Sequence, residues 1–396
     1  MTLCFSILIN ICLGFSYTWS IFVLSLAKHL GRTLAEVTLA YTIGTTVFTM
    51  SNIVGGRLFD KFGPVSAIRI GAILFGGGLF LTGLTSSLIW LYFFYGVVTY
   101  SGIGLAYCAV LMNVNNYYPE KRGAVSGLVT AAYGLSAVVF SPVATTLIEN
   151  FGVLIAYRAL GLFFILILTF SSFFVRRAPK AEKKYAGGPK GAPCDLTWNQ
   201  MIRTSSFYII YALMIIGATG GLMIISQASV MAQHMMRASA GTAAFTLSLI
   251  AGANTAGRLA WGLLSDKAGR VTTQHFIFLI SPSMLLCLTF VGSSQYALFT
   301  AFAMLIAFCY GGIMGTFPAL STERFGTKNS GTNYSIIMTG LGFASLIGPM
   351  TAANILTLTG GYGLAFYTLS ALGFIGFFLT FVLRKQQLSR ASGLRI

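Results

Sequence analysis

The chain has 396 residues, of which 56% are hydrophobic and only 8% are charged. Soluble globular proteins carry about 25% charged residues, so this composition excludes a water-soluble globule. The 25 Lys and Arg against 8 Asp and Glu give a formal net charge of +17. We expect no nucleic-acid partner, because the apolar excess leaves no exposed surface for a basic patch. The six cysteines show no paired spacing, so neither a disulfide framework, a metal site nor a cofactor is expected.

Apolar segments long enough to cross a bilayer recur along the whole chain, since about 20 residues span about 30 Å of hydrocarbon. The predicted fold class is an all-α membrane protein with twelve transmembrane helices. The first segment lacks a clear cleavage site, so we expect a retained helix rather than a signal peptide. The predicted spans are residues 2–27, 35–57, 66–86, 89–117, 123–148, 153–175, 204–233, 241–264, 272–292, 296–322, 331–357 and 361–383.

The positive charges predict the orientation of these spans, because cytoplasmic loops collect Lys and Arg. If both termini are cytoplasmic, twenty of the 25 basic residues fall on that side and four fall outside: Lys28, Arg32, Arg158 and Arg237. The remaining one, Arg258, lies within the eighth span. We therefore expect a multi-pass protein of the cell (inner) membrane with both termini in the cytoplasm.

The sequence repeats one plan in two halves. A polar stretch over 176–203 that contains AGGPKGAP predicts a flexible cytoplasmic linker. It separates an N-terminal six-helix bundle, 1–175, from a C-terminal one, 204–383, and 384–396 is predicted to be a cytoplasmic tail. The halves share motifs about 203 to 207 residues apart: Gly56-x-x-x-Asp60-Lys61-x-Gly63 with Gly262-x-x-x-Asp266-Lys267-x-Gly269, Tyr107 with Tyr310, and Pro142 with Pro349. Duplicated halves around a central site are a transporter design.

Twelve spans with this loop motif after the second and the eighth resemble the major facilitator superfamily over essentially the whole chain. The resemblance implies two pseudo-symmetric six-helix bundles. We expect the loop residues to form a conformational latch, in which the Asp and the Lys cap helix ends and pair across the two bundles. The alternative is that Asp60 and Lys61 merely solvate a short turn.

Further strings resemble the branch of this superfamily that holds the oxalate:formate antiporters and the monocarboxylate transporters. These strings are Tyr17-Thr18-Trp19, Tyr107 with Asn113-x-Asn115-Asn116, Tyr118-Pro119-Glu120-Lys121-Arg122-Gly123, and Asn254-x-x-Gly257-Arg258-x-x-Trp261-Gly262. The resemblance implies a carrier of small carboxylates in which Arg258 binds the substrate carboxylate.

Arg258 also stands out from its chemistry alone. A guanidinium within a membrane helix is unfavourable by at least about 2.5 kcal/mol unless it faces a cavity or a partner, and its fork fits a carboxylate. The alternative is snorkelling, because Arg258 precedes Asp266 by eight residues, about 12 Å along a helix.

One intramembrane cation predicts a monoanion such as lactate, pyruvate or formate, because a dianion would leave one charge unpaired. The oxalate transporter has a further lysine in its eleventh helix, whereas residues 333–342 here contain none. Asn254 lies one helical turn before Arg258 on the same face and is predicted to orient the guanidinium or hold water. Five other side chains are predicted to line the site by hydrogen bonding or ring contact, although each would serve equally well in helix packing. They are Tyr107, Tyr310, Tyr17, Gln227 and Tyr133.

The sequence leaves the coupling open. Animal monocarboxylate transporters place an aspartate where Asn254 stands, and an amide does not titrate. Glu149 and His234 are candidates for carrying a proton at an outer entrance, although a solvated role at a helix end accounts for both. We expect a monomeric secondary carrier that is not an enzyme, with protons as a coupling partner. The alternatives are an oxalate/formate-type exchanger and a non-transporting carboxylate sensor.

Overall fold

Every secondary-structure element in the residues that the computed structural model describes, 1–179 and 195–391, is a helix. These helices form two compact units. Unit 1 consists of Met1–Tyr118, Ala132–Pro179 and Thr327–Thr339, and unit 2 consists of Pro119–Ala131, Lys180–Gly326 and Gly340–Ile396. The units follow the two halves of the sequence except at two short segments. Pro119–Ala131 of the first half belongs to unit 2, and Thr327–Thr339 of the second half belongs to unit 1. The bundle limits 1–175 and 204–383 remain a prediction.

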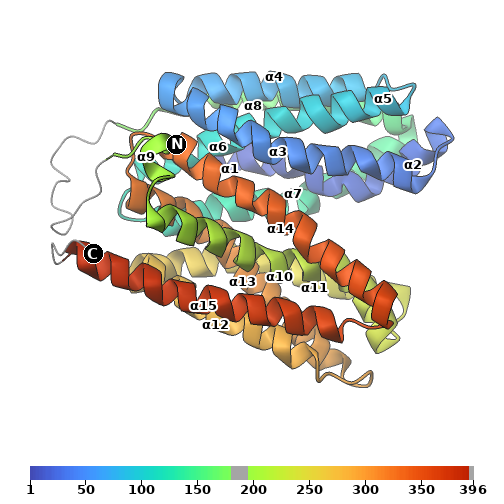
Figure 1. Ribbon diagram of the computed structural model, residues 1–396. Helices are drawn as coiled ribbons and strands as arrows, with labels where there is room; N and C mark the ends of the chain where they lie inside the picture. Colours follow the sequence, from blue (N-terminus) through green and yellow to red (C-terminus); the bar gives the residue numbers. More distant parts are fainter. Residues whose placement is uncertain (180–194, 392–396) are drawn as a thin grey trace. The chain divides into compact units, whose positions relative to one another are not determined.

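The first half of the chain forms the elements drawn from blue to green in Figure 1. Within unit 1, α4 packs on α8 and on α6, and α6 also packs on α3. The elements of this half are α1 (Thr2–Leu13), η1 (Gly14–Thr18), α2 (Trp19–Leu30), α3 (Leu34–Phe62), α4 (Pro64–Thr82), α5 (Leu88–Leu91), η2 (Tyr92–Thr99), α6 (Tyr100–Tyr117), α7 (Arg122–Phe151) and α8 (Val153–Ser172).

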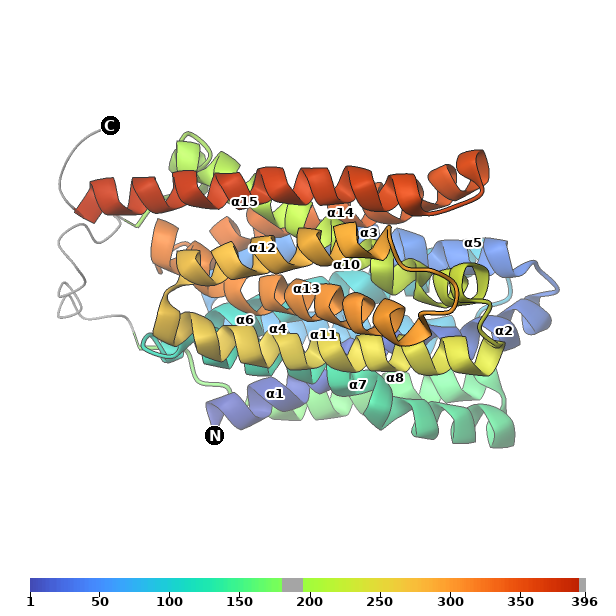
Figure 2. The ribbon, with the colours of Figure 1, turned by 90° about the horizontal axis from the view of Figure 1, so that it is seen from below.

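The second half forms the elements drawn from green to red. Within unit 2, α11 packs along α13, and α12 packs on α15 and α13 (Figure 2). The elements of this half are α9 (Trp198–Met201), α10 (Ser205–Met236), α11 (Ala240–Ala268), α12 (Arg270–Leu288), α13 (Tyr296–Phe325), α14 (Ser330–Thr359) and α15 (Gly363–Ala391).

The twelve predicted spans all have a helical counterpart. Among the described residues, ten helices are long and apolar enough to cross a membrane, and the bent pair Thr2–Thr18 and Ile21–Leu30 makes an eleventh. The twelfth helix is α11, which corresponds to the eighth predicted span. It is not among the eleven apolar ones, and it contains the polar pair Asn254 and Arg258. The expectation of an all-α membrane protein with twelve spans is confirmed.

Two predicted boundaries differ from the observed helices. The linker prediction over 176–203 missed α9, which begins with a capping box because Thr197 and Gln200 satisfy each other's backbone amides. The predicted tail over 384–396 is helical as far as Ala391, since α15 continues through good helix formers beyond its apolar part. Residues 180–194 and 392–396 lie outside the described part of the chain.

Two predicted spans are also not regular helices. The first is interrupted by the 3₁₀ segment η1, and the fourth contains the π-helical segment η2. A hydrophobicity pattern does not distinguish these forms from an α-helix, because all three place apolar side chains at similar spacing.

Small residues let the helices of unit 1 approach closely. A methyl group at Gly102 of α6 would collide with the backbone of Phe75 and with the carbonyl oxygen of Gly71, both in α4. Lipid chains are as apolar as the helix surfaces, so helix association depends on such close packing and on hydrogen bonds.

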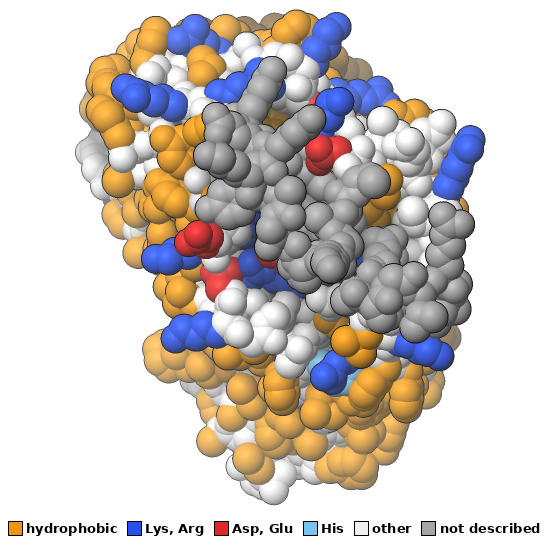
Figure 3. Space-filling model, turned by 90° about the vertical axis from the view of Figure 1, so that its left-hand side faces the viewer, with side chains coloured by type: hydrophobic (Ala, Val, Ile, Leu, Met, Phe, Trp, Pro, Cys, Tyr) orange, Lys and Arg blue, Asp and Glu red, His pale blue; other side chains and the backbone are white. Residues whose placement is uncertain are grey.

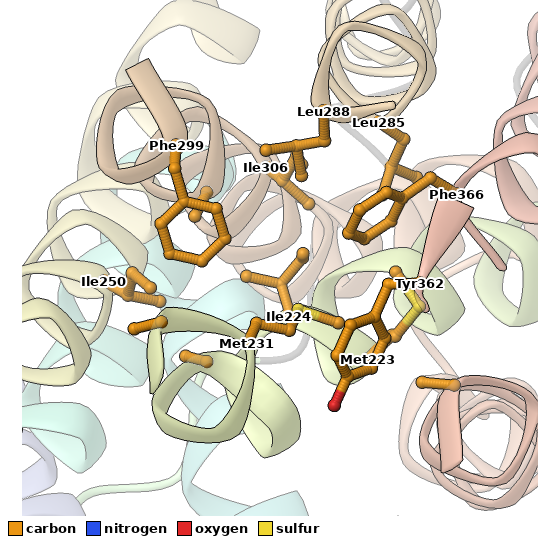
Figure 4. Close-up of a cluster of buried hydrophobic side chains, with 14 of the residues drawn as sticks. Met223, Ile224, Met231, Ile250, Leu285, Leu288, Phe299, Ile306, Tyr362 and Phe366 are labelled. Atoms are coloured by element: carbon orange, nitrogen blue, oxygen red, sulfur yellow. The ribbon is translucent and has the colours of Figure 1, made fainter. Parts of the chain in front are cut away.

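Unit 2 has a core of interlocking aliphatic and aromatic side chains (Figure 4). In this cluster, side chains of α10 are buried together with those of α11, α12, α13, α14 and α15. Its labelled members are Met223, Ile224, Met231, Ile250, Leu285, Leu288, Phe299, Ile306, Tyr362 and Phe366.

We predict that Gly102→Ala lowers the stability of the protein by about 1–3 kcal/mol, because an overpacked site cannot relax when backbone faces backbone. The matched control is Gly77→Ala in α4, where a Cβ would meet nothing within 4 Å. Thermal unfolding of the two purified variants in the same detergent measures the difference. Equal melting temperatures would contradict the close-packing argument.

Candidate functional site

Arg258 lies in the middle of α11 and is buried, with 4% of its surface exposed. Its Nε donates a hydrogen bond to Oδ1 of Asn254 at 3.2 Å, and its Nη1 donates to the carbonyl oxygen of Thr130 at 2.9 Å. Asn254 in turn donates from Nδ2 to the carbonyl oxygen of Ala307 in α13, at 3.1 Å. The guanidinium therefore turns toward protein acceptors inside unit 2, and the snorkelling alternative does not describe it.

Glycines bring the neighbouring helices against the backbone of α11 at Arg258. A methyl group at Gly127 of α7 or at Gly315 of α13 would collide with the carbonyl oxygen of Arg258, and one at Gly311 with that of Asn254. Because α7 and α13 contact α11 at this depth, a side chain of α11 reaches a main-chain carbonyl of α7. The sequence pattern Gly123-x-x-x-Gly127 is a signal for such contact.

Three of the predicted tyrosines meet in unit 1. The ring of Tyr133 lies edge-on to Tyr17, with centroids 5.2 Å apart, and edge-on to Tyr107, at 5.5 Å. The Tyr133 hydroxyl is 2.9 Å from Oγ of Ser16. Tyr17 is 44% exposed, whereas Tyr107 and Tyr133 are buried. A cluster of this kind combines ring edges and hydroxyl groups that are suited to a small polar ligand.

The other two predicted residues lie in unit 2. Tyr310 of α13 is buried against α10, where its ring fills the space that a side chain at Gly221 would need. Gln227 of α10 is half-buried. The structure thus brings Arg258 and Asn254 together in unit 2, and Tyr17, Tyr107 and Tyr133 together in unit 1.

The two loop motifs hold helix N-termini through their aspartates. In unit 2, Asp266 accepts hydrogen bonds from the amides of Gly123 and Ala124 at the start of α7, at 2.9 and 2.7 Å. In unit 1, Asp60 accepts them from the amides of Gly331 and Thr332 at the start of α14, at 3.1 and 2.8 Å. A carboxylate at a helix N-terminus satisfies free amides and interacts favourably with the helix dipole.

The remaining motif residues explain its spacing. Gly63 and Gly269 have φ of +87° and +89°, which favours glycine. At Gly56 a side chain would collide with Gly331, and at Gly262 with Gly123. Lys61 and Lys267 are exposed, so the contacts just described are made by the aspartates and not by the lysines.

Sequence reasoning missed an ion-pair network in unit 2. Arg270 pairs with Asp266 at 2.6 Å and with Glu323 of α13 at 2.9 Å. The repeat gave a partial signal, since the pair Glu120-Lys121 matches Glu323-Arg324. In the first half of the sequence, the repeat places Pro64 where the second half has Arg270. Asp60 therefore has no arginine at that position and instead accepts a hydrogen bond from the Thr332 hydroxyl at 2.6 Å.

Lys and Arg side chains gather at the ends of the helices that Figure 3 faces. This is the side on which the loop motifs and the positive-inside rule place the cytoplasm. The orientation itself remains a prediction.

A protein-family model covers nearly the whole of this helical plan. The model, described as Major Facilitator Superfamily, matches residues 4–349 and 231–395. The chain belongs to the Major Facilitator Superfamily. It is therefore a multi-pass membrane transporter and not an enzyme.

Its relatives include the branch predicted from the motifs. An uncharacterized MFS-type transporter, YhjX of Escherichia coli (strain K12), is 30% identical over 346 residues, covering 87% of this chain and 85% of the relative. The oxalate:formate antiporter of Oxalobacter formigenes is 28% identical over 373 residues, 93% of this chain and 88% of that one. Monocarboxylate transporter 13 of Bos taurus is 25% identical over 362 residues, 90% and 82%.

Solved structures agree on the fold of this transporter. The human organic anion transporter MFSD10 superposes with a TM-score of 0.74 at 13% identity, covering 96% of this chain and 98% of that one. FucP of E. coli in the outward conformation gives 0.70 at 14% identity, covering 95% and 97%. At these identities the similarity establishes the fold alone.

The two proton candidates lie near helix ends. Glu149 near the end of α7 is exposed, and so is His234 near the end of α10, whose ring is edge-on to Tyr362 with centroids 6.2 Å apart. In the part of the chain that the structure describes, no group of three or more His, Cys, Asp or Glu is placed to hold a metal ion.

We predict that Asp266→Asn destabilises the transporter by about 1–3 kcal/mol, because an amide group then meets two backbone donors and the ion pair with Arg270 is removed. Asp60→Asn should have a smaller effect, since the first half has Pro64 at the position of Arg270. Thermal unfolding in detergent measures both, and Lys267→Ala, at an exposed position, serves as the control. A latch role for the aspartates would be contradicted if all three variants unfolded like the wild type.

Proposed function

We propose that the transporter carries a small monocarboxylate, of the lactate, pyruvate or formate class, by alternating access. Arg258 anchors the substrate carboxylate, and protons move with the anion. Similarity to an oxalate:formate antiporter and to monocarboxylate transporters supports a carboxylate as cargo.

The observation that carries the proposal is the buried guanidinium of Arg258. Two of its acceptors are a neutral amide, at Nε, and a neutral carbonyl, at Nη1. An ionised carboxylate is a stronger acceptor for a guanidinium than either of them, and in a low-dielectric interior such a charge-assisted pair is stronger than at a surface. Neutralising Arg258 would also ease closure of the loaded carrier, which links anion binding to movement.

The same charge balance favours a monoanion. The stretch 333–342 at the start of α14 contains no Lys or Arg, and a second carboxylate in an apolar site would lack a partner. Within unit 2, Tyr310 and Gln227 are proposed to contact the rest of the substrate. Substrate binding by Tyr17, Tyr107 and Tyr133, which cluster in unit 1, remains a proposal from the sequence.

The alternative is an anion exchanger that takes oxalate or formate. It is favoured by the 28% identity to the oxalate:formate antiporter over 93% of this chain. In that case internal anion, and not a proton gradient, would drive uptake. A sensor that binds carboxylate without moving it would show neither kind of uptake.

We predict that proteoliposomes containing the wild type accumulate labelled lactate or formate when an inward proton gradient is imposed. Uptake that depends only on preloaded internal carboxylate would establish exchange instead. Competition by unlabelled oxalate tests the dicarboxylate alternative. Absence of uptake of lactate, formate and oxalate under both conditions would overturn the transport proposal.

We predict that Arg258→Lys lowers the initial uptake rate by about tenfold or more, because a compact ammonium does not reproduce the two-bond fork of the guanidinium. The matched control is Arg32→Lys, since Arg32 has 57% of its side chain exposed. Wild-type kinetics in Arg258→Lys would remove Arg258 from the anchoring role.

We predict that Asn254→Asp makes uptake strongly dependent on pH. While it is ionised, an aspartate at this position would pair with Arg258 and compete with the substrate carboxylate. Uptake should therefore be inhibited at high pH and recover as the pH falls and the introduced carboxylate takes up a proton. Initial rates between about pH 3 and 8, with Asn254→Ala as the control, measure this, because a carboxyl beside a guanidinium takes up a proton only under acid conditions. An unchanged pH profile would contradict the placement of Asn254 beside the bound anion.

A further inference from the structure

We propose that the carbonyl oxygen of Thr130 is an acceptor for Arg258 in the empty carrier, and that the substrate carboxylate takes its place and so releases α7 from α11. This inference rests on the proposed function, in which Arg258 binds the substrate. It adds the acceptor that Arg258 gives up, the carbonyl of Thr130, and the α7–α11 hydrogen bond that breaks at the same moment.

The hydrogen bonds of Arg258 determine which edge of the guanidinium the substrate uses. Asn254 occupies Nε, so a carboxylate would approach the edge formed by the two terminal nitrogens. A carboxylate that binds this edge with two parallel bonds takes one N–H of Nη1, the atom that also donates to Thr130 at 2.9 Å, and so draws the guanidinium away from that carbonyl. Asn254 is therefore a positioning residue for this exchange of acceptors.

The competition favours the carboxylate. Thr130 lies within α7, eight residues after its start at Arg122, where a helical carbonyl already serves the intrahelical hydrogen-bond ladder. A carboxylate is ionised and offers two oxygens to the fork, so its bonds to a guanidinium are roughly twice as strong as those of a neutral acceptor.

Arg258 and Asp266 of α11 each clamp the first turns of α7 by hydrogen bonds. Arg258 holds the carbonyl of Thr130, and Asp266, eight residues later in α11, holds the amides of Gly123 and Ala124. Eight residues are about two turns of α-helix, which matches the seven residues between Gly123 and Thr130. Two side chains of one helix thus clamp two turns of the other.

The backbones between these two clamps are in direct contact. A methyl group at Gly127 would collide with the carbonyl oxygen of Arg258, and one at Gly123 with that of Gly262. Such a seam has few side chains that could adjust. Removal of the Thr130 bond should therefore loosen the segment, while the hydrogen bonds of Asp266 to Gly123 and Ala124 stay in place.

Hydrogen–deuterium exchange of the full-length protein, followed by mass spectrometry of the segment 122–131, tests the proposal. We expect exchange there to become about tenfold faster when saturating formate or lactate is added to the wild type. Arg258→Gln should exchange at that faster rate without any acid. Arg258→Lys should keep slow exchange, because an ammonium still donates to one carbonyl, and should not respond to the acid.

Three outcomes would overturn the proposal. One is a wild-type protein whose hydrogen–deuterium exchange at 122–131 does not change when an acid is added that the same preparation transports. This outcome does not depend on whether any variant folds. Another is wild-type exchange in Arg258→Gln without acid. The third is a wild-type protein that takes up neither formate nor lactate. This result overturns the proposed function as well as the replacement of Thr130 by the substrate, and the uptake assay alone detects it.

Discussion

A guanidinium buried inside a helix unit of a membrane protein must be surrounded by acceptors, and this constraint organises the structure around α11. Arg258 finds its acceptors at Asn254, four residues earlier on its own helix, and at Thr130, on another helix. The second bond is possible only because glycines of α7 and α13 let these helices touch the backbone of α11. The charge, the glycine seam and the helix arrangement therefore depend on one another.

The two aspartates of the repeated loops apply the same principle at the helix ends. Each carboxylate accepts from two amides at the start of a helix from the opposite half of the sequence, α7 for Asp266 and α14 for Asp60. This is why the compact units do not follow the sequence halves at 119–131 and 327–339. The arrangement is repeated but not identical, because Arg270 and Glu323 reinforce Asp266, whereas a threonine hydroxyl reinforces Asp60.

Much of the site could be anticipated where the interaction is local. The bond between Arg258 and Asn254 follows from their four-residue spacing on one helix face, and the turn glycines follow from the loop motif. The clustering of Tyr17, Tyr107 and Tyr133 was only suggested, since each tyrosine had an equally good role in packing. The bond to Thr130 could not be anticipated, because it uses a main-chain oxygen that has no sequence signature.

The sequence by itself determined that this is a twelve-helix membrane protein of the major facilitator superfamily, with two related halves and one Lys or Arg, Arg258, near the middle of a span. These properties are local, since a bilayer leaves the chain little choice but helices, and composition reports where they lie. Only the tertiary structure decided which groups meet: Arg258 with Thr130, 128 residues apart, and Asp60 with Thr332, 272 residues apart. Such pairs depend on how closely the helices pack and in which register, and this is a property of the assembled units rather than of any one segment.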